Sequence, residues 1–303
     1  MTRRVADEMA AAVTTLTDAG VASPRADAEW LLAAVLGVDR GRLLVADDLD
    51  DDTAARYRAA VARRATREPL QHITGTAAFG SVDLAVGPGV FVPRPETELL
   101  LQWALDRIET TAPSTRIADL CSGSGALAIA LADAVPGADV YAVENSAAAL
   151  EWLRRNAADA RRADGTDPSA IEVVAADVTD LAAMTAAIPP GSIDIVVSNP
   201  PYVPVAAPVD PEVRADPSVA VFGGDDGLSV IAPMVPVIAR LLRPGGWVGI
   251  EHDDTTADLV IGLLARSGTF ADVTPHTDLA GRPRFVTARR HTDAADRDTT
   301  ATV

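Results

Sequence analysis

A short loop, Asn199-Pro200-Pro201-Tyr202, carries the residues best suited to chemistry in this chain of 303 residues. It directly follows the apolar segment 193–198, whose composition is that of a buried strand. Two adjacent prolines fix φ and remove two N–H donors, so the loop is stiff and its carbonyl oxygens are free to accept hydrogen bonds. The side-chain oxygen of Asn199 and the carbonyl of Pro200 can together accept both N–H bonds of a planar NH2 group.

The nitrogen of an amide or arylamine is a poor nucleophile because its lone pair is delocalised. Accepting both of its N–H bonds aims that lone pair at an electrophile and stabilises the positive charge that develops on nitrogen. Tyr202 can stack on the planar group. The loop therefore favours N-methylation from a methyl sulfonium, which is electrophilic enough that no dedicated general base is required. A proline-rich exit from a strand is the structural alternative.

A glycine-rich turn, Cys121-Ser122-Gly123-Ser124-Gly125, follows the apolar segment 116–120. Glycines let the backbone pass close to a ligand at the carboxyl edge of the sheet, where α/β folds bind nucleotides. The spacing differs from the G-x-G-x-x-G dinucleotide fingerprint, because no glycine lies three residues after Gly125. The turn alone is a weak signal, and a purely structural turn is the alternative.

Two acidic residues follow the next two apolar segments. Glu144 directly follows the segment 139–143 and lies about 20 residues beyond the glycine turn. At this position a carboxylate can accept hydrogen bonds from both hydroxyls of a ribose. Asp177 follows the segment 171–175 and can accept a bond from an adenine amino group. Either residue can instead cap the next helix. Three such sites at successive strand ends indicate a ligand with an adenosine moiety and no required pyrophosphate.

The elements that must position these residues alternate along most of the chain. This rhythm predicts an α/β domain with a mostly parallel sheet that helices cover on both faces. We expect helices at 96–110, 126–134, 147–160, 229–242 and 256–267, and strands at 116–120, 139–143, 171–175, 193–198, 247–251 and 285–288.

The first part of the chain has a different pattern. Apolar residues at helical spacing predict a helix from Val5, a second helix that begins at Ser23-Pro24 and stops at Gly37, and a third over 52–66. Short alternating segments broken by glycines predict a β-hairpin over 73–92. We therefore expect a helical bundle at 1–70, a β-hairpin connector at 71–95, a catalytic domain at 96–290 and a disordered tail at 291–303.

The composition of the chain indicates which classes of partner and which cellular compartment are expected. The net charge of -17 disfavours a surface that wraps nucleic acid, although acidity can simply keep a protein soluble. Cys121 is the only cysteine and the four histidines are scattered, so neither a disulfide nor a metal site is expected. No apolar run approaches the roughly 20 residues that span a bilayer. These features favour a cytoplasmic protein with no DNA or membrane partner, and we expect a monomer.

With these motifs, the sequence resembles the HemK/PrmC family, the protein-(glutamine-N5) methyltransferases that modify the Gly-Gly-Gln glutamine of peptide-chain release factors. The loop at Asn199 is shared with adenine and cytosine amino-methyltransferases, but the resemblance covers nearly the whole chain. The other segments that carry it are Ser23-Pro24-Arg25-Ala26-Asp27-Ala28-Glu29, Pro69-Leu70-Gln71-His72-Ile73-Thr74-Gly75, Val92-Pro93-Arg94-Pro95-Glu96-Thr97-Glu98, Gly223-Gly224-Asp225-Asp226-Gly227-Leu228 and Gly281-Arg282-Pro283-Arg284.

The resemblance implies a Rossmann-like class I S-adenosylmethionine-dependent methyltransferase domain, with a small N-terminal helical domain that recognises the substrate. It implies S-adenosylmethionine as cofactor and a class I release factor as protein substrate. Cofactor contacts are implied at Asp119, Cys121, Ser122, Gly123, Ser124, Gly125, Glu144, Asp177, Val178 and Asn199. Substrate contacts are implied at Arg94, Glu96, Thr97, Asn199, Pro200, Pro201 and Tyr202, of which the last four carry the catalysis.

Three positions depart from the family pattern. Cys121 stands where the family usually has its first glycine, so the turn is expected to avoid a positive φ there. Val178 replaces a frequent aromatic residue beside Asp177, which weakens the expected packing on adenine. The segment Glu251-His252-Asp253-Asp254 lacks the glycine expected two residues after the glutamate.

Other functions remain open at this stage. A related ribosomal-protein glutamine methyltransferase would share the loop and the fold. A DNA adenine N6-methyltransferase would need base flipping and a basic cleft, which the low isoelectric point disfavours. A catalytically inactive cofactor-binding protein of the translation machinery is the non-enzyme alternative, and the intact loop at Asn199 argues against it.

Overall fold

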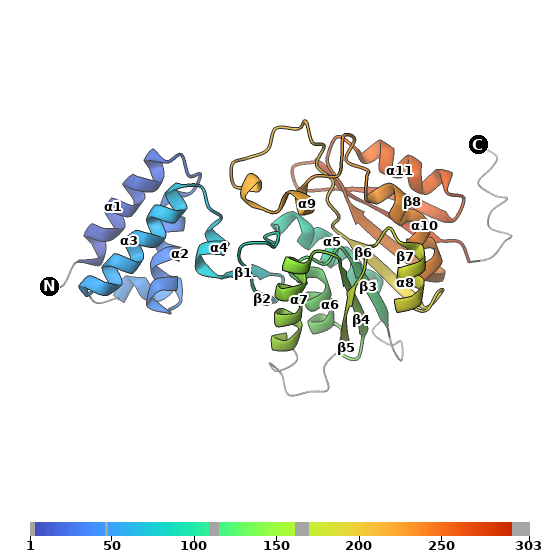
Figure 1. Cartoon of the computed structure of the whole chain (residues 1–303), viewed down its shortest axis with the longest axis horizontal. Coiled ribbons are helices and arrows are strands. Elements are labelled where there is room, and N and C mark those ends of the chain that lie inside the picture. Colours follow the sequence, from blue (N-terminus) through green and yellow to red (C-terminus); the bar gives the residue numbers. More distant parts are fainter. Residues whose placement is uncertain (1–3, 46–47, 109–114, 161–169, 293–303) are drawn as a thin grey trace. The chain divides into compact units, whose positions relative to one another are not determined.

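The computed structural model describes residues 4–45, 48–108, 115–160 and 170–292 (Figure 1). The chain forms two compact units. The helical unit comprises Met1–Thr76, Val86–Pro88 and Val209–Asp216, and the sheet unit comprises Ala77–Ala85, Gly89–Pro208 and Pro217–Val303. The chain thus leaves the sheet unit after Pro208 and returns to it at Pro217, an excursion that no sequence pattern indicated. The domain boundaries expected from the sequence stay predictions.

The helical unit is built on α1 (Val5–Asp18), α2 (Pro24–Leu36) and α3 (Asp51–Ala65), with a 3-10 helix η1 (Arg40–Val45) and a short α4 (Leu70–Thr74). Apolar side chains at helical spacing point inward, and Leu16, Leu32 and Tyr57 are fully enclosed. The Tyr57 hydroxyl donates to the carbonyl oxygen of Ala28 at 3.1 Å, which satisfies its buried polar end.

The ends of these helices follow from the sequence. Pro24 is the first residue of α2, and Gly37 ends that helix with a left-handed φ of 66°. Ser23 occupies the N-cap position, but its side chain makes no capping hydrogen bond. Asp50, from the acidic run before α3, does cap its helix by accepting from the Thr53 N–H at 2.7 Å.

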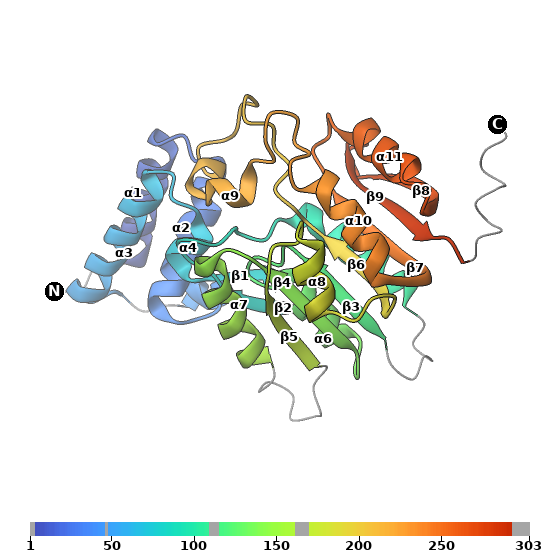
Figure 2. The ribbon, with the colours of Figure 1, turned by 45° about the vertical axis from the view of Figure 1, so that its right-hand side comes forward.

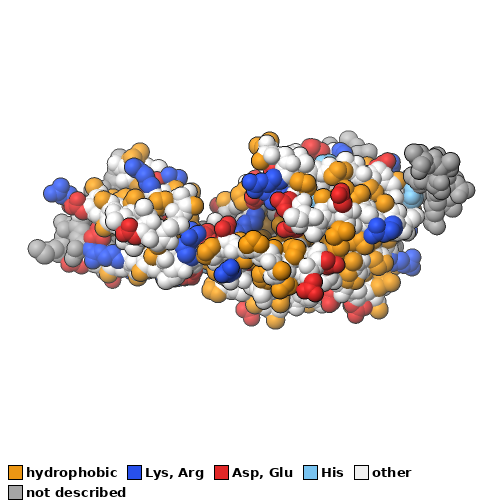
Figure 3. Space-filling model, turned by 90° about the horizontal axis from the view of Figure 1, so that it is seen from above, with side chains coloured by type: hydrophobic (Ala, Val, Ile, Leu, Met, Phe, Trp, Pro, Cys, Tyr) orange, Lys and Arg blue, Asp and Glu red, His pale blue; other side chains and the backbone are white. Residues whose placement is uncertain are grey.

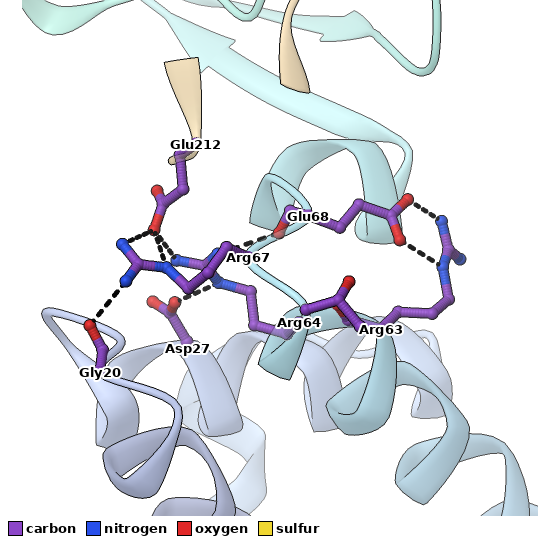
Figure 4. A network of polar contacts seen from close by, with 8 residues as sticks. Gly20, Asp27, Arg63, Arg64, Arg67, Glu68 and Glu212 are labelled. Carbon is purple, nitrogen blue, oxygen red and sulfur yellow. Dashed lines mark hydrogen bonds and ion pairs between the residues drawn. The ribbon is translucent and has the colours of Figure 1, made fainter. Parts of the chain in front are cut away.

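A buried polar network holds residues Val209–Asp216 within the helical unit (Figure 4). Arg64, only 4% exposed, donates to Asp27 at 2.7 Å, to Glu212 at 2.7 Å and to the Glu68 carbonyl oxygen at 2.9 Å. Arg67 donates to the same Oε1 of Glu212 at 2.9 Å and to the Gly20 carbonyl oxygen at 2.8 Å. Glu212 therefore accepts from two guanidinium groups, one of them almost fully buried.

The sheet unit contains a two-stranded hairpin and a seven-stranded sheet. The hairpin pairs β1 (Thr76–Phe79) with β2 (Val82–Ala85). The large sheet has the order β5-β4-β3-β6-β7-β9-β8, in which β9 is antiparallel to both β7 and β8 and the remaining pairs are parallel. Its strands are β3 (Arg116–Leu120), β4 (Asp139–Glu144), β5 (Ala170–Ala175), β6 (Ile193–Ser198), β7 (Leu242–Glu251), β8 (Phe270–Thr277) and β9 (Pro283–Arg290).

Two groups of helices cover this sheet (Figure 2). In one group α5 packs on α6 and α6 on α7, and in the other α10 packs on both α8 and α11. Ala118 and Leu120 of β3 belong to the core beneath the second group, so Asp119 between them faces the first group. The helices are α5 (Glu98–Arg107), α6 (Ala126–Ala134), α7 (Ala147–Ala160), α8 (Leu181–Ala187), α9 (Ser218–Val221), α10 (Ile231–Leu241) and α11 (Ala257–Arg266), with 3-10 turns η2 (Pro95–Thr97) and η3 (Val213–Ala215).

The sequence predicted the main elements but missed several short or exposed ones. The strand β8 was not expected, because it is largely exposed at the edge of the sheet and contains Pro275. The helices α4, α8 and α9 were also not expected, since each is too short to show a clear helical period. The helix expected at 96–110 starts as a 3-10 turn and ends at Arg107, while residues 109–114 lie outside the described part of the chain, as do residues 293–303 of the tail.

Candidate active site

The order of the strands opens a crevice at one edge of the sheet. The chain connects β3 to β4 on one side and later returns to β6 on the other side of β3, so the crossover helices diverge there. In α/β sheets, ligands bind outside the carboxyl ends of the strands at this kind of switch point. The Cys121–Gly125 turn and the Asn199–Tyr202 loop directly follow β3 and β6, and these neighbouring strands bring both motifs to the same edge.

A cavity of about 700 Å³ occupies this edge of the sheet unit. Its walls include eleven of the residues implicated by the sequence, which come from four strand ends and from the segment before α5. They are Thr97, Asp119, Cys121, Ser122, Gly123, Ser124, Glu144, Asp177, Val178, Asn199 and Pro201. Gly125, Pro200, Tyr202, Arg94 and Glu96 do not line the cavity.

The glycine turn has left-handed backbone at three alternate positions, with φ of 65° at Cys121, 56° at Gly123 and 90° at Gly125. The expectation that the turn avoids a positive φ at Cys121 was therefore wrong. The turn is held by hydrogen bonds from Ser122 N to the Val143 carbonyl oxygen at 2.9 Å and from Gly125 N to the Ser122 carbonyl oxygen at 2.8 Å. These bonds hold Cys121 in the left-handed conformation in spite of its Cβ.

The two glycines of the turn have different physical roles. A Cβ on Gly125 would lie 2.7 Å from Leu153 and 2.9 Å from Ile129, so this glycine lets the turn pack against α6 and α7. A Cβ on Gly123 would meet nothing within 4 Å, although Gly123 lines the cavity. Gly123 therefore leaves open space beside the backbone where a ligand can approach.

Asp119 is a buried acid whose side chain reaches the cavity wall. Its Oδ2 accepts from the Ala128 N–H of α6 at 3.1 Å, while its Oδ1 is buried and has no hydrogen-bond partner among the described residues. Burial raises the pKa of Asp119 to about 7, and the bond from Ala128 opposes this rise. A carboxylate with an unused, buried acceptor atom fits a ligand that is cationic or donates hydrogen bonds.

Glu144 lies at the end of β4 and organises the backbone around the cavity. Its Oε1 accepts from the N–H groups of Asn145 at 2.9 Å and Ser146 at 2.8 Å, and its Oε2 accepts from the Gly123 N–H at 2.9 Å. A carboxylate has about four acceptor positions, of which about one remains on Oε2. Glu144 thus satisfies backbone N–H groups just before α7 and also faces the cavity, and its contact with a ribose stays a prediction.

The residues after β5 form the third part of the wall. Asp177 Oδ1 accepts from the backbone N–H of Thr179 at 2.8 Å and from its hydroxyl at 2.7 Å, which makes a tight turn. Val178 is buried in the sheet core and lines the cavity with an aliphatic surface. The assignment of Asp177 to an adenine amino group stays a prediction.

The Asn199 loop is fixed at both ends by side-chain hydrogen bonds. Asn199 donates from Nδ2 to the Thr97 hydroxyl oxygen at 2.9 Å, and the Tyr202 hydroxyl donates to Oε1 of Glu251 at 2.9 Å. Because the Tyr202 hydroxyl is directed at Glu251 and the residue does not line the cavity, stacking of Tyr202 on the substrate stays a prediction. The carbonyl oxygen of Pro200 accepts no hydrogen bond from any described residue.

Glu251 was noted in the sequence only for a missing glycine after it, yet it supports the Asn199 loop by accepting from Tyr202. It is 3% exposed and ends β7, beside β6 in the sheet. Burial raises the pKa of Glu251 to about 7, opposed by the neighbouring hydroxyls of Thr97 and Tyr202. Burial, the Glu251 charge and the hydrogen bond to Glu251 together raise the pKa of Tyr202 well above its ordinary value, so Tyr202 stays a neutral donor.

The motif Gly223-Gly224-Asp225-Asp226-Gly227-Leu228 packs directly on the backbone of the Asn199 loop. A Cβ on Gly223 would lie 2.6 Å from the Pro201 carbonyl oxygen, and one on Gly227 would lie 2.3 Å from that of Tyr202. The Gly223 N–H donates to the Val203 carbonyl oxygen at 3.0 Å. These glycines are therefore needed because the two backbones touch.

Arg94 and Glu96 lie near the site without reaching the cavity. The Arg94 guanidinium stacks over the ring of Phe91 at 5.1 Å from its centroid, and Phe91 does line the cavity. Glu96 lies 4.0 Å from Arg284 of the Gly281-Arg282-Pro283-Arg284 segment. Their assignment to substrate contacts stays a prediction.

Sequence reasoning missed the hairpin side of the cavity. Phe79 and Phe91 contribute aromatic wall, and nothing in the local pattern distinguished them from core residues. Asn156 of α7 was also missed. It is 4% exposed, exchanges hydrogen bonds with Ala85 N and O at 2.9 Å, and donates to the Ser124 carbonyl oxygen at 2.9 Å. An asparagine on an otherwise apolar helical face was the available signal.

Two kinds of site are absent from the described residues. They contain no group of three or more His, Cys, Asp or Glu side chains that could hold a metal ion. None of the described helices has the length and apolar character that a bilayer crossing requires.

Comparison with known proteins decides the family. Residues 9–75 match the PrmC N-terminal domain and residues 82–210 match the Methyltransferase small domain. The chain is 53% identical to the release factor glutamine methyltransferase of Mycolicibacterium smegmatis, over 95% of this chain and 98% of that one. It is 48% identical to that of Corynebacterium glutamicum, over 92% and 96% of the two chains. This chain belongs to the release factor glutamine methyltransferases.

The family assignment confirms the resemblance to HemK/PrmC proteins and the expected fold class. Among solved structures, the catalytic domain of hMettl16 in complex with the MAT2A 3'UTR hairpin 6 has a TM-score of 0.50 and 15% identity, over 80% of this chain and 83% of that one. That likeness concerns the fold alone. The match to the PrmC N-terminal domain lies within the helical unit, and the match to the Methyltransferase small domain covers the first part of the sheet unit.

Proposed function

We propose that this protein transfers the methyl group of S-adenosylmethionine to the side-chain amide nitrogen, N5, of the glutamine in the Gly-Gly-Gln motif of class I peptide-chain release factors. The observation that carries the proposal is the position of Asn199, at a strand end next to a cavity whose other walls carry Asp119 and Glu144. The relatives named release factor glutamine methyltransferase, at 48–53% identity over nearly the whole chain, support the same activity.

The residues of the cavity fit S-adenosylmethionine. The cofactor supplies a methyl group on a positively charged sulfur and also carries an amino group. Asp119 presents a buried acceptor atom without a partner, Glu144 has about one unused acceptor position, and Gly123 leaves open space beside the backbone. Val178 and Leu127 add apolar surface for a planar base. Two acidic side chains in a largely apolar wall favour a cationic ligand over a pyrophosphate.

The loop residues hold the substrate glutamine and orient the lone pair of its amide nitrogen. The Oδ1 of Asn199 and the carbonyl oxygen of Pro200 accept the two N–H bonds of the amide, which turns its lone pair toward the electrophile. As the nitrogen forms a new bond it gains positive charge, and these two oxygen dipoles stabilise that charge. The amide nitrogen then loses a proton. No general base is assigned, since the charged, methylated amide is acidic enough to release its proton to water.

The helical unit and the acidity of the chain bear on the partner. We propose that the helical unit recognises the release factor and that the protein acts as a monomer in the cytoplasm, where translation ends. A DNA substrate is disfavoured by the net charge of -17. On the face of the sheet unit seen in Figure 3, Arg side chains are scattered among acidic and apolar ones without a continuous basic surface.

A labelling experiment tests the proposal. The protein is incubated with methyl-labelled S-adenosylmethionine and, separately, unmodified release factor, ribosomal proteins and DNA. We expect label on the Gly-Gly-Gln glutamine, and a release factor with Gln replaced by Glu in that motif is the control that should stay unlabelled. Label only on a ribosomal protein or on DNA would overturn the substrate assignment.

Two variants separate cofactor binding from catalysis. Asn199→Ala should lower turnover at least 100-fold while the dissociation constant for S-adenosylmethionine changes little, because an acceptor aimed at the reacting nitrogen is lost. Glu144→Ala should weaken cofactor binding about 10-fold or more, because it removes a ligand contact and the bonds that shape the turn. An unchanged dissociation constant in Glu144→Ala would remove that residue from the cofactor site.

A further inference from the structure

Thr97 directs its side chain at the Asn199 loop. It is the last residue of η2 and directly precedes α5, with a helical φ of -67° and ψ of -20° rather than the extended backbone from which a threonine side chain caps a helix by accepting from a backbone N–H. Its hydroxyl makes no such bond and instead accepts from Asn199 Nδ2 at 2.9 Å, across 102 residues of sequence. The residue is 4% exposed and lines the cavity. The hydroxyl is thus directed toward the Asn199 loop.

This bond determines which end of the Asn199 side chain remains available. A side-chain amide has a donor end, the NH2 group, and an acceptor end, the oxygen. The bond to Thr97 uses the donor end, and no described residue donates to Oδ1. If the Asn199 side-chain amide were rotated by 180°, its NH2 group would face the NH2 group of a bound glutamine. Two hydrogen-bond donors would then face each other, and no hydrogen bond could form between them.

A threonine hydroxyl can also donate, so a further group must keep its oxygen as the acceptor. Glu251 meets this need above about pH 7, where its carboxyl group is ionised, since an ionised carboxylate only accepts hydrogen bonds. The Thr97 hydroxyl lies beside the Glu251 carboxyl group and favours its charged form. Tyr202 donates to the same carboxyl group at 2.9 Å. When the Thr97 proton points toward Glu251, the Thr97 oxygen can only accept from Asn199.

We propose that Thr97, backed by Glu251, is a positioning residue that locks the Asn199 amide with Oδ1 toward the substrate amide. The inference rests on the proposed function, because the value of a fixed Oδ1 depends on a substrate with an NH2 group. It also changes the role of Thr97, which the sequence assigned to substrate contact. Both ends of the catalytic loop then depend on one buried carboxyl group, through Thr97 at Asn199 and directly at Tyr202.

Kinetics of two Thr97 variants provide the first test. Thr97→Val keeps the shape and removes the hydroxyl, and Thr97→Ser keeps the hydroxyl. On release factor, we expect Thr97→Val to lower kcat by about 30-fold or more, with the cofactor dissociation constant within about 2-fold of wild type. Thr97→Ser should restore kcat to within about 3-fold. A Thr97→Val enzyme with wild-type kcat overturns the proposal, and so does a Ser variant as slow as the Val variant.

Hydrogen exchange of the Asn199 side-chain amide tests this inference without any methyl transfer, and therefore independently of the proposed function. The chain contains three asparagines, Asn145, Asn156 and Asn199, so selective ¹⁵N-asparagine labelling gives a simple side-chain amide spectrum. The Asn199 signals are identified by their loss in Asn199→Ala. Their exchange with water should be slow in wild type and Thr97→Ser and at least about 10-fold faster in Thr97→Val. The Asn156 amide, bonded to Ala85 and Ser124, is the internal reference and should not change.

The two measurements assign each failure to its cause. If wild type does not label a release factor, the proposed function fails, while the exchange of the Asn199 amide still decides the role of Thr97. If Thr97→Val leaves that exchange unchanged, the positioning role is wrong whatever the substrate. If exchange quickens but kcat stays at the wild-type value, the bond is merely structural and the proposal is also wrong. Should Thr97→Val fail to bind cofactor, Thr97→Ala replaces it in both measurements.

Discussion

Glu212 lies 148 residues beyond Arg64 in the chain, yet its carboxylate accepts from the Arg64 guanidinium at 2.7 Å inside the helical unit (Figure 4). The residue comes ten positions after Tyr202, on the segment Val209–Asp216 that leaves the sheet unit. Arg67 binds the same oxygen with a left-handed φ of 70°. A segment that follows the Asn199 loop is therefore anchored among helices from the start of the chain.

Loss of the Glu212 carboxylate should destabilise the helical unit. Glu212→Ala leaves the almost fully buried Arg64 with one carboxylate partner, Asp27, instead of two. Because the Glu212 side chain is 27% exposed, water compensates in part, and we expect a loss of about 1–2 kcal/mol in the free energy of unfolding. Arg25→Ala is the control, since it breaks a pair in which Arg25 is 83% exposed and should cost less than about 0.5 kcal/mol. Urea unfolding of both variants measures these free energies. Equal losses of stability in Glu212→Ala and Arg25→Ala would contradict the prediction.

Gly227 should tolerate no side chain, in contrast to Gly281, which has nearly the same φ. Gly227 and Gly281 have φ of 76° and 79°, so alanine is strained at both positions. A Cβ on Gly227 would lie 2.3 Å from the Tyr202 carbonyl oxygen, whereas one on Gly281 would meet nothing within 4 Å. Gly281→Ala should cost about 1 kcal/mol of stability, and Gly227→Ala clearly more, with loss of methyl transfer. Similar thermal unfolding of the two variants would contradict the close contact.

The strained Cys121 offers a test of backbone conformation alone. At φ 65° a residue with a Cβ costs about 1–2 kcal/mol, and glycine does not. Cys121→Ala and Cys121→Gly both remove the thiol, so their difference isolates the strain. We expect Cys121→Gly to be more stable than Cys121→Ala by about 1 kcal/mol in urea unfolding. Equal stability would show that the turn relaxes when the side chain changes.

Features of the molecule could be predicted from the sequence where they depend on residues close together in the chain, and not where they depend on residues far apart. The strand ends that carry Asp119, Glu144 and Asn199 were expected, because strand, turn and helix signals are local and parallel strands align their carboxyl ends. The φ of Cys121 was not, since hydrogen bonds from Ser122 and Gly125 override the preference of one side chain. Local patterns cannot show such competition.

The partners of the catalytic loop were beyond local sequence signals for the same reason. Thr97 was implicated in substrate contact, but its bond to Asn199 joins two distant segments. Glu251 looked like one more charged residue at a strand end, and only its burial at 3% exposure reveals its support of Tyr202. Asn156 and Glu212 likewise act on residues far away in the chain. Side-chain pairs of this kind depend on the packed structure.

The buried carboxyl group of Glu251 should make stability depend on pH in a defined direction. Burial raises its pKa from 4.5 in the unfolded chain to about 7 in the folded protein. Between these values the folded state holds more protons than the unfolded state, so this group's contribution to stability is present below pH 4.5 and is lost as pH rises through about 7. The size of that loss is on the order of 3 kcal/mol.

Glu251→Gln removes this titration while keeping a side-chain oxygen that can accept from Tyr202. Relative to wild type, the variant should therefore gain stability between pH 5 and pH 8, by about 2–3 kcal/mol in urea unfolding. Asp119 also has a pKa raised by burial to about 7, but it is present in both proteins and cancels in the difference. A difference between variant and wild type that stays constant from pH 5 to pH 8 would mean that Glu251 is ionised as readily in the folded protein as in the unfolded chain. In that case the buried carboxylate would need stronger donors than the hydroxyls of Thr97 and Tyr202 that neighbour it.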